Sequence, residues 1–519
     1  MSEYSMAGAY AAHSVRMRWL VPAVFIVAAA AFGAAIPMTP PWWIPLAVVA
    51  GLVVMVSTAI FPMIGLVATF LLTVQVVPPQ FAPEVSLKVV KLDPGEILFM
   101  WTFFVCAARA VLLKQSDKFE WPRFSIPVLF ILGCAFVGVV YGKYIQHNGE
   151  FVLAEARGFL GLLALPMIQF LIRDRNDIRQ LCMWLCFAAV IVAGYIIVQT
   201  VTGIPILGGR FEPLDHENAD VMRSVAPGAS VQAFALYYMA LSLKSPGGRI
   251  RFWLLPLILI VLLGLLGTFG RGTWVTTALG GLIVAFLIGK WRGLFLAMLA
   301  GVLLVTLTLS AAYVVKPRVA EAAIDRALGI GRELDKGDSF GWRRIENQLA
   351  IKSILKRPWL GTGLGGIYKD VASSRGHFDA EFYFIHNSYL FFPLKMGIFA
   401  ALGPILIIGT FLLLFLRIYR MTNGQVGTIV AICTGLTVVM HIAAYAGQTL
   451  RSFPGLLPLC TAMGLCACMY RFLRAEQKAS PQVEVIPRAV PRGPARVRET
   501  RIVSPTRPAL PAFARPKEA

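Results

Sequence analysis

Long apolar stretches follow one another along most of the chain. Stretches such as Phe252–Phe269 and Phe295–Val315 stay apolar over roughly the 17–25 residues that a helix needs to cross a bilayer. The strands of a membrane barrel would instead alternate apolar and polar residues, and these stretches do not. A chain segment within a bilayer must satisfy its own backbone hydrogen bonds, so the pattern predicts membrane-spanning helices.

The pattern predicts an all-α polytopic membrane protein with about 14 transmembrane helices of about 20 residues each and one large periplasmic loop. The expected spans are 19–36, 42–58, 61–78, 95–113, 125–142, 152–172, 180–201, 229–243, 252–269, 273–289, 293–315, 387–416, 426–443 and 454–473. The first span follows Arg16 and Arg18 and is succeeded by further spans, so we interpret it as a retained helix and not a cleaved signal peptide.

Loop charge predicts the orientation of the chain. Predicted inner loops such as Lys114–Arg123 and Arg173–Arg179 are basic, whereas the short outer loops 37–41 and 79–94 are nearly neutral. Both termini are therefore expected in the cytoplasm, with the segment 316–386 on the outer side of the membrane. The predicted parts are the cytoplasmic N-terminus 1–18, a first transmembrane part 19–315, the periplasmic loop domain 316–386, a second transmembrane part 387–474, and a disordered, basic Pro/Arg-rich cytoplasmic tail 475–519.

Composition supports the same environment. Hydrophobic residues make up 57% of the chain and charged residues only 14%, against about 25% charged in soluble domains. The net charge is +21, but the basic residues gather in short loops and the tail, which favours contact with the lipid bilayer and excludes nucleic acid as an expected partner. All eight cysteines lie in apolar stretches, so no disulfide framework or metal site is predicted, and no cofactor.

The loop 316–386 contains one predicted helix, which starts at Ser339 and ends before Arg357–Pro358. Its apolar residues lie on more than one face, so it is expected to pack against the membrane domain. The loop also contains a GxGxxG pattern at 361–366. Because no strand–turn–helix unit frames it, we reject a dinucleotide site and expect tight turns where the loop meets the membrane domain.

His386 stands at the end of this loop, where the next span begins. A neutral imidazole at that boundary could take a proton from a hydroxyl group near neutral pH. A histidine that only caps or anchors the helix is the alternative, and spacing alone leaves both open.

Several arginines stand near the predicted outer ends of spans. They are Arg210, Arg223, Arg271 and Arg451. Guanidinium groups bind phosphate in a bidentate manner and keep their charge, so together they could hold a pyrophosphate. Snorkelling or simple ion pairing is the alternative for each one. Intramembrane ionisable residues are few, with Glu96, Glu155 and Lys395 the most evident, which weakens a proton-coupled transporter interpretation.

Four sequence elements, in order, resemble the O-antigen ligase and Wzy-type polymerase superfamily over about 200 residues, from Arg210 to Gly403. They are Arg223-Ser-Val-Ala-Pro-Gly228, Gly270-Arg-Gly-Thr-Trp274, Trp342-Arg343 through Pro358-Trp-Leu-Gly-Thr-Gly363, and His386-Asn-Ser-Tyr-Leu390 with Gly397. The resemblance implies an inverting, metal-independent glycosyltransferase whose site faces the periplasm. It implies a donor glycan on undecaprenyl pyrophosphate, with a glycan or lipid A core as acceptor.

By this resemblance, His386 would be the catalytic base, and Arg223, Arg271 and, as a weaker match, Arg210 would bind the pyrophosphate. The expected function is an O-antigen ligase-like transfer in lipopolysaccharide or exopolysaccharide assembly. Polymerisation of repeat units by a Wzy-type enzyme shares the donor and differs in acceptor. A flippase or exporter of the same lipid-linked glycan, or an envelope scaffold that uses the tail, would not need His386.

Overall fold

The computed structural model describes residues 43–78, 85–87, 90–112, 121–207, 210–214, 221–225, 228–244, 249–328, 339–369 and 382–479. Within these ranges, seven helical segments are long and apolar enough to cross a membrane. They are Pro94–Leu112, Phe124–Tyr144, Gly149–Leu171, Arg175–Thr202, Arg271–Val315, Ile398–Met421 and Phe453–Ala479. The predicted helical, multi-pass membrane protein is thereby confirmed. The span 19–36 lies outside the described residues, and fourteen spans remain a prediction.

Helices occupy nearly all of the predicted spans that the structure describes. Their bounds are α2 Trp43–Ile60, α3 Pro62–Thr73, α4 Pro94–Leu112, α5 Trp121–Tyr144, α6 Gly149–Arg157, α7 Ala164–Leu171, α8 Arg175–Thr202, α9 Ala229–Ser242, α10 Leu254–Gly267, α11 Arg271–Val315, α12 Pro317–Leu328, α14 Ser339–Lys356, α15 Ser388–Met396, α16 Leu402–Met421, α17 Thr428–Ala443 and α18 Phe453–Ala479. Two short antiparallel hairpins join them, β1 Val85–Leu87 with β2 Val90–Leu92, and β3 Arg210–Pro213 with β4 Met222–Val225.

The core lies between α8, α9, α10, α17 and α18, where small residues let helices approach closely. A Cβ on Gly264 of α10 would lie 2.5 Å from the Cβ of Ala193 on α8, so this crossing depends on two small side chains. Helix α17 is buried along most of its length. The outer helices expose large apolar side chains, such as Phe136 on α5 and Leu303 on α11, as expected where lipid is the solvent.

Two predicted spans are interrupted, and two others are joined into one kinked helix. The span 152–172 consists of α6, the 3₁₀ helix η3 (Gly158–Leu163) and α7. The span 387–416 breaks after α15 at Gly397, whose positive φ of 87° precedes the 3₁₀ helix η5 (Ile398–Ala401) and α16. Helix α11 covers two predicted spans and departs from helical geometry at Lys290, with φ of 52°.

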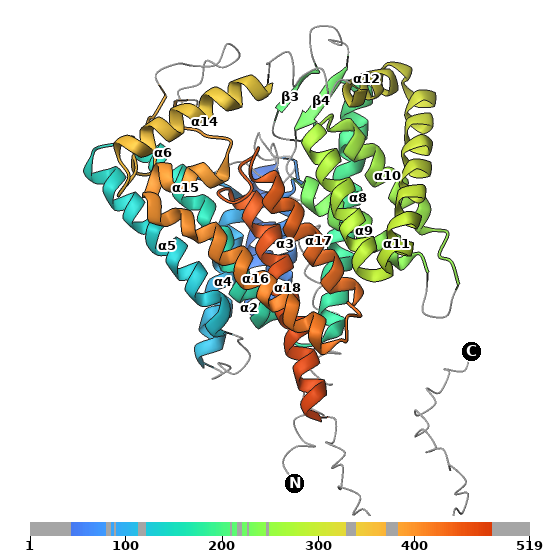
Figure 1. Cartoon of the computed structure of the whole chain (residues 1–519), viewed down its shortest axis with the longest axis horizontal. Coiled ribbons are helices and arrows are strands. Elements are labelled where there is room, and N and C mark those ends of the chain that lie inside the picture. Colours follow the sequence, from blue (N-terminus) through green and yellow to red (C-terminus); the bar gives the residue numbers. More distant parts are fainter. Residues whose placement is uncertain are drawn as a thin grey trace, which may run out of the picture. The chain divides into compact units, whose positions relative to one another are not determined.

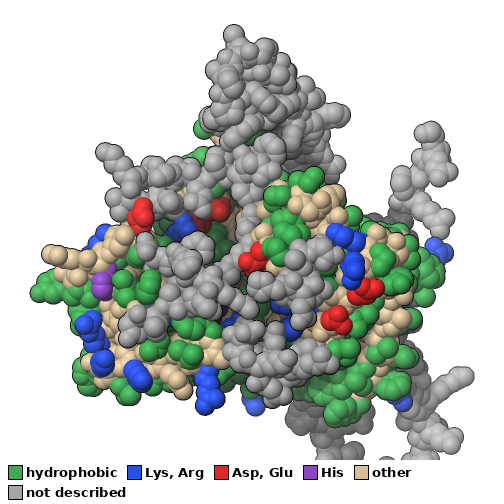
Figure 2. Space-filling model, turned by 90° about the horizontal axis from the view of Figure 1, so that it is seen from above, with side chains coloured by type: hydrophobic (Ala, Val, Ile, Leu, Met, Phe, Trp, Pro, Cys, Tyr) green, Lys and Arg blue, Asp and Glu red, His purple; other side chains and the backbone are tan. Residues whose placement is uncertain are grey.

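Helix α14, the β3–β4 hairpin and α12 lie together at one end of the helix bundle, called here the α14 end (Figure 1). Helix α14 lies across the bundle and packs on α15, as the sequence predicted for the helix of loop 316–386. Viewed onto the α14 end, charged side chains lie among exposed hydrophobic ones (Figure 2). Segments far apart in the sequence thus meet at this end.

The glycine pattern at 361–366 forms tight turns against the membrane domain, as predicted. Gly361, Gly363 and Gly365 all have positive φ values between 65° and 76°. A Cβ on Gly363 would lie 2.9 Å from the Cα of Gly142 on α5, so the turn touches that helix directly. These turns hold the chain that links α14 to the next span against α5 and α6.

Candidate functional site

His386 is held by a carboxylate of α14. The Oε2 atom of Glu346 lies 2.9 Å from the ring Nδ1 of His386 and accepts the backbone N–H of the same residue at 2.9 Å. The Glu346 side chain is fully buried, whereas 38% of the His386 side chain is exposed. A carboxylate at Nδ1 favours the tautomer with the proton on Nδ1, which leaves Nε2 able to accept a proton.

A buried lysine completes the environment of Glu346. Lys369 Nζ lies 2.8 Å from Glu346 Oε1, and both side chains are inaccessible to solvent. Burial by itself would raise the pKa of Glu346, but the hydrogen bonds from His386 and Lys369 outweigh it and lower the pKa from 4.5 to about 2. Glu346 is therefore ionised at neutral pH and acts as an acceptor for both partners.

Arg451, in the loop between α17 and α18, binds the segment that precedes His386. Its Nη2 donates to the carbonyl oxygen of Ile385 at 2.6 Å, and its guanidinium group lies over the ring of Phe384 with 4.3 Å to the centroid. Only 7% of Arg451 is exposed. Burial lowers the pKa of Arg451, and the acidic groups around it oppose that shift. The arginine thus fixes the backbone next to the histidine.

The same loop lines a cavity of about 340 Å³. The cavity lies between the starts of α9 and α11, the end of α17 and the loop that leads into α18. Its polar lining consists of neutral groups, namely Ser230, Thr273, Thr276, Thr277, Gln448, Thr449 and Ser452. Ser388 Oγ donates to the carbonyl oxygen of Gly447 at 2.7 Å, so the segment of His386 is bonded to the loop that forms one cavity wall.

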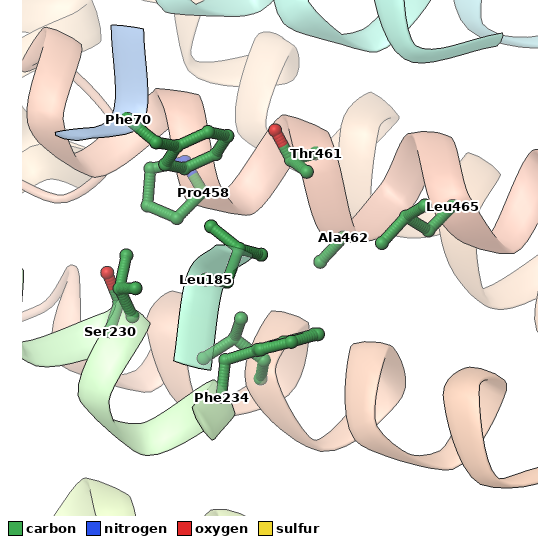
Figure 3. A pocket seen from close by; sticks show the side chains of 10 residues that line it. Phe70, Leu185, Ser230, Phe234, Pro458, Thr461, Ala462 and Leu465 are labelled. Atoms are coloured by element: carbon green, nitrogen blue, oxygen red, sulfur yellow. The ribbon is translucent and has the colours of Figure 1, made fainter. Parts of the chain in front are cut away.

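A smaller apolar pocket adjoins this cavity and shares Ser230 and Leu436 with it. Phe70, Leu185, Phe234 and Pro458 surround it (Figure 3). Its volume of about 10 Å³ leaves room for about one water molecule. On this side, the cavity therefore borders the packed core between α9, α17 and α18.

The predicted arginines lie in segments at the same α14 end. Arg223 is on β4, and its Nε donates to Glu212 Oε1 of β3 at 3.0 Å. Arg271 is the first residue of α11, and its Nε donates to the carbonyl oxygen of Arg326 on α12 at 2.8 Å. Gly228 follows the β4 segment and Thr273 follows Arg271, and both line the cavity. Arg210 begins β3 opposite Val225, and its side chain lies outside the described part.

A comparison with models of protein families shows which family part of this chain resembles. Residues 256–405 match the model of the O-antigen ligase family (Wzy_C). This part of the chain is similar to the O-antigen ligase family. The resemblance to the O-antigen ligase and Wzy-type superfamily is thereby confirmed. The matched range contains Arg271 and His386, whereas Arg210, Arg223 and Arg451 lie outside it.

Other comparisons add little. No curated protein matches the chain. One solved structure is 18% identical to this chain, with a TM-score of 0.37. The similarity covers 68% of this chain and 98% of the chain in that structure, which comes from work on "Structural coordination of polymerization and crosslinking by a peptidoglycan synthase complex". A likeness of this size supports no conclusion about fold or function.

The matched range 256–405 also contains one partner of a second buried ion pair. Lys395 Nζ of α15 lies 3.1 Å from Glu155 Oε1 of α6, and both side chains are almost fully buried. Glu155 also accepts the backbone N–H of Gly365 at 2.6 Å, and Lys395 donates to the carbonyl oxygen of Gly366 at 2.7 Å. The pair therefore anchors the glycine turns of loop 361–366 to the membrane helices.

Sequence reasoning did not single out Glu346 or Lys369. One signal was available for Glu346, because it shares a helical face with Ala350 and Ile354, at steps of four residues. A lone carboxylate in an otherwise apolar stripe is expected to have a buried partner. Lys369 carries no comparable local signal, since its burial depends on contacts with α14.

Proposed function

We propose that the protein transfers a glycan from undecaprenyl pyrophosphate to a sugar hydroxyl at the α14 end, which would face the periplasm of the bacterial inner membrane. The observation that carries this proposal is the Glu346–His386 pair inside the range that matches the O-antigen ligase family. A buried carboxylate that orients an exposed imidazole is the arrangement expected of a general base.

In the proposed reaction, the acceptor hydroxyl oxygen attacks the anomeric carbon of the donor sugar. The Nε2 of His386 takes the hydroxyl proton, the anomeric carbon–oxygen bond to pyrophosphate breaks, and undecaprenyl pyrophosphate leaves with the bonding electrons. A single displacement of this kind inverts the anomeric configuration. Glu346 stays ionised and stabilises the imidazolium that forms.

The leaving pyrophosphate needs fixed positive charge. Arg271 begins α11, where the helix dipole adds to its own charge, and Arg223 stands on the strand that leads toward the cavity. Their present partners are a carbonyl oxygen and a carboxylate, which a pyrophosphate could replace. We assign these two arginines to the pyrophosphate, with Arg210 as an additional contact.

The cavity favours a transferase over an exporter of the same lipid. An exporter of a lipid-linked pyrophosphate would need a cationic lumen, and the described residues that line this cavity are uncharged. The polar groups that the described residues contribute to it are hydroxyls and amides, which suits a neutral sugar ring. We place the sugar next to the scissile bond in this cavity.

The test is a reconstituted assay with a lipid-linked oligosaccharide and two acceptors, lipid A core and the free end of a second lipid-linked glycan. His386→Gln can still donate to Glu346 but is a poor base, so transfer should fall about 10²–10⁴-fold. His147→Gln is the matched control, because His147 contacts only the carbonyl oxygen of Thr362 among the interactions described for it. Full activity of His386→Gln would reject the base assignment, and the productive acceptor distinguishes ligase from polymerase.

A further inference from the structure

Helix α14 has a second face that the transfer reaction does not use. Glu346, Ala350 and Ile354 form its buried face, while Ile351 and Leu355 lie one turn apart on the far side. The exposed fraction is 46% for Ile351 and 75% for Leu355. Apolar side chains this exposed, side by side on one helix, indicate a surface that is normally covered.

Basic side chains flank this apolar strip. Lys352 and Lys356 also lie one turn apart on the exposed side of the helix, and Arg357 follows directly. Exposed apolar and basic side chains thus lie side by side over the last turns of α14, and a helix end of this kind can rest in the membrane interface with its apolar residues toward the acyl chains. Basic side chains of this length can reach the phosphate groups while their carbon stems stay in the interface.

The end of α14 is bonded to the end of a membrane-spanning segment. The backbone N–H of Ile398 donates to the carbonyl oxygen of Pro358 at 2.7 Å, and the rings of Trp359 and Phe399 lie 5.9 Å apart. Ile398 begins the candidate span Ile398–Met421. The end of α14 therefore stands at the level where that span leaves the bilayer.

The apolar strip of α14 continues onto this span. Trp359 is 68% exposed and Phe399 59%, and they are followed by the exposed side chains of Leu402, Ile405 and Leu406 on α16. Tryptophan at the boundary between a span and water is the usual interfacial anchor. Lys and Arg side chains lie next to hydrophobic ones along the rim of the α14 end (Figure 2).

We propose that the outward face of α14, formed by Ile351, Leu355 and Trp359 with Lys352 and Lys356, binds anionic phospholipids in the leaflet on the α14 side. The apolar residues insert beside α16, and the two lysines bind the headgroup phosphates. Since the opposite face of the same helix carries Glu346, lipid binding holds the carboxylate that orients His386. In this proposal, the bound lipid stabilises the position of the site in addition to surrounding the membrane helices.

The test measures whether Trp359 inserts among the acyl chains of the bilayer, and it does not require glycan transfer. The protein is reconstituted in phosphatidylcholine vesicles with increasing phosphatidylglycerol, using brominated acyl chains that quench nearby tryptophans. The chain has eleven tryptophans, so the signal of Trp359 is the difference between the wild type and Trp359→Phe, which keeps an aromatic contact with Phe399. Quenching of Trp359 should rise with the phosphatidylglycerol fraction.

Two variants test the charged part of the proposal. In Lys352→Gln/Lys356→Gln, the apparent affinity for phosphatidylglycerol should fall about fivefold for each lysine, which corresponds to about 1 kcal/mol per basic group near an anionic surface. Half-maximal quenching should therefore require a higher phosphatidylglycerol fraction than in the wild type. Arg318→Gln is the control, because Arg318 is 73% exposed on α12 at the same end. Inorganic phosphate added to phosphatidylcholine vesicles should leave the quenching unchanged.

Either of two results overturns the proposal. One is a Trp359 signal that stays unquenched at every lipid composition, which would place the α14 face in water or against another protein. The other is a double lysine variant that titrates like Arg318→Gln. Neither result depends on glycan transfer, so failure here is distinguishable from failure of the proposed enzymatic function.

Discussion

One carboxylate oxygen, Oε2 of Glu346, lies 2.9 Å from both the backbone nitrogen and the ring Nδ1 of His386. A single buried atom therefore fixes the position of the residue and the tautomer of its ring. Lys369 holds the other oxygen of the same carboxylate at 2.8 Å. The imidazole is thus oriented by a group that is itself held on both sides, which is the usual requirement for a precise proton transfer.

We expect Glu346→Gln to retain folding and to lower glycan transfer by about 10²-fold, since the amide cannot stabilise the imidazolium by charge. Glu346→Ala should lower it further, because the ring loses its acceptor altogether. The measurement is the initial rate with lipid-linked oligosaccharide at fixed acceptor. Glu321→Gln, an exposed carboxylate on α12, is the control and should keep wild-type activity. Equal rates for both variants and the wild type would show that Glu346 does not orient the base.

The lowered pKa of Glu346 predicts how stability depends on pH. Its pKa falls from 4.5 to about 2 on folding, so the ionised form stabilises the native state. This contribution is complete above about pH 4.5 and is lost as the pH falls toward about 2. The melting temperature of the wild type should exceed that of Glu346→Gln at pH 6 to 7, and the gap should narrow below pH 4.5. A gap that stays constant down to pH 3 would contradict the ion pairing.

The sequence predicted the helices because apolar length is a local property, and it predicted His386 as a candidate because of its place at a span boundary. The break of the span 387–416 could not be predicted in the same way. It occurs at Gly397, where a Cβ would lie 1.8 Å from the carbonyl oxygen of Trp359, so the break depends on a distant segment. The partners of Glu346 are equally non-local, since Lys369 and His386 reach it from the far end of the loop.

A double-mutant cycle can test the buried pair Glu155–Lys395. Lys395→Met leaves the carboxylate buried without its cation and should cost about 3–5 kcal/mol. Glu155→Gln/Lys395→Met removes both charges, and the amide oxygen can still accept the N–H of Gly365, so it should be more stable than Lys395→Met alone. Thermal unfolding in detergent measures these two variants and the single variant Glu155→Gln, which completes the cycle. A double variant less stable than Lys395→Met would show that the two charges do not interact.

Gly158 offers a test of the close contact that supports the α17–α18 loop. A Cβ at Gly158 would lie 2.0 Å from the carbonyl oxygen of Arg451, so Gly158→Ala must push away the loop that holds Ile385 and lines the cavity. We expect a loss of about 1–3 kcal/mol in stability, together with slower glycan transfer. Gly194→Ala in α8 is the matched control, because nothing lies within 4 Å of its Cβ position, and it should gain up to about 1 kcal/mol in helix propensity. The melting temperature should therefore fall in Gly158→Ala and rise in Gly194→Ala. A Gly158→Ala protein as stable and active as the wild type would mean that the α17–α18 loop does not approach η3 this closely in the membrane.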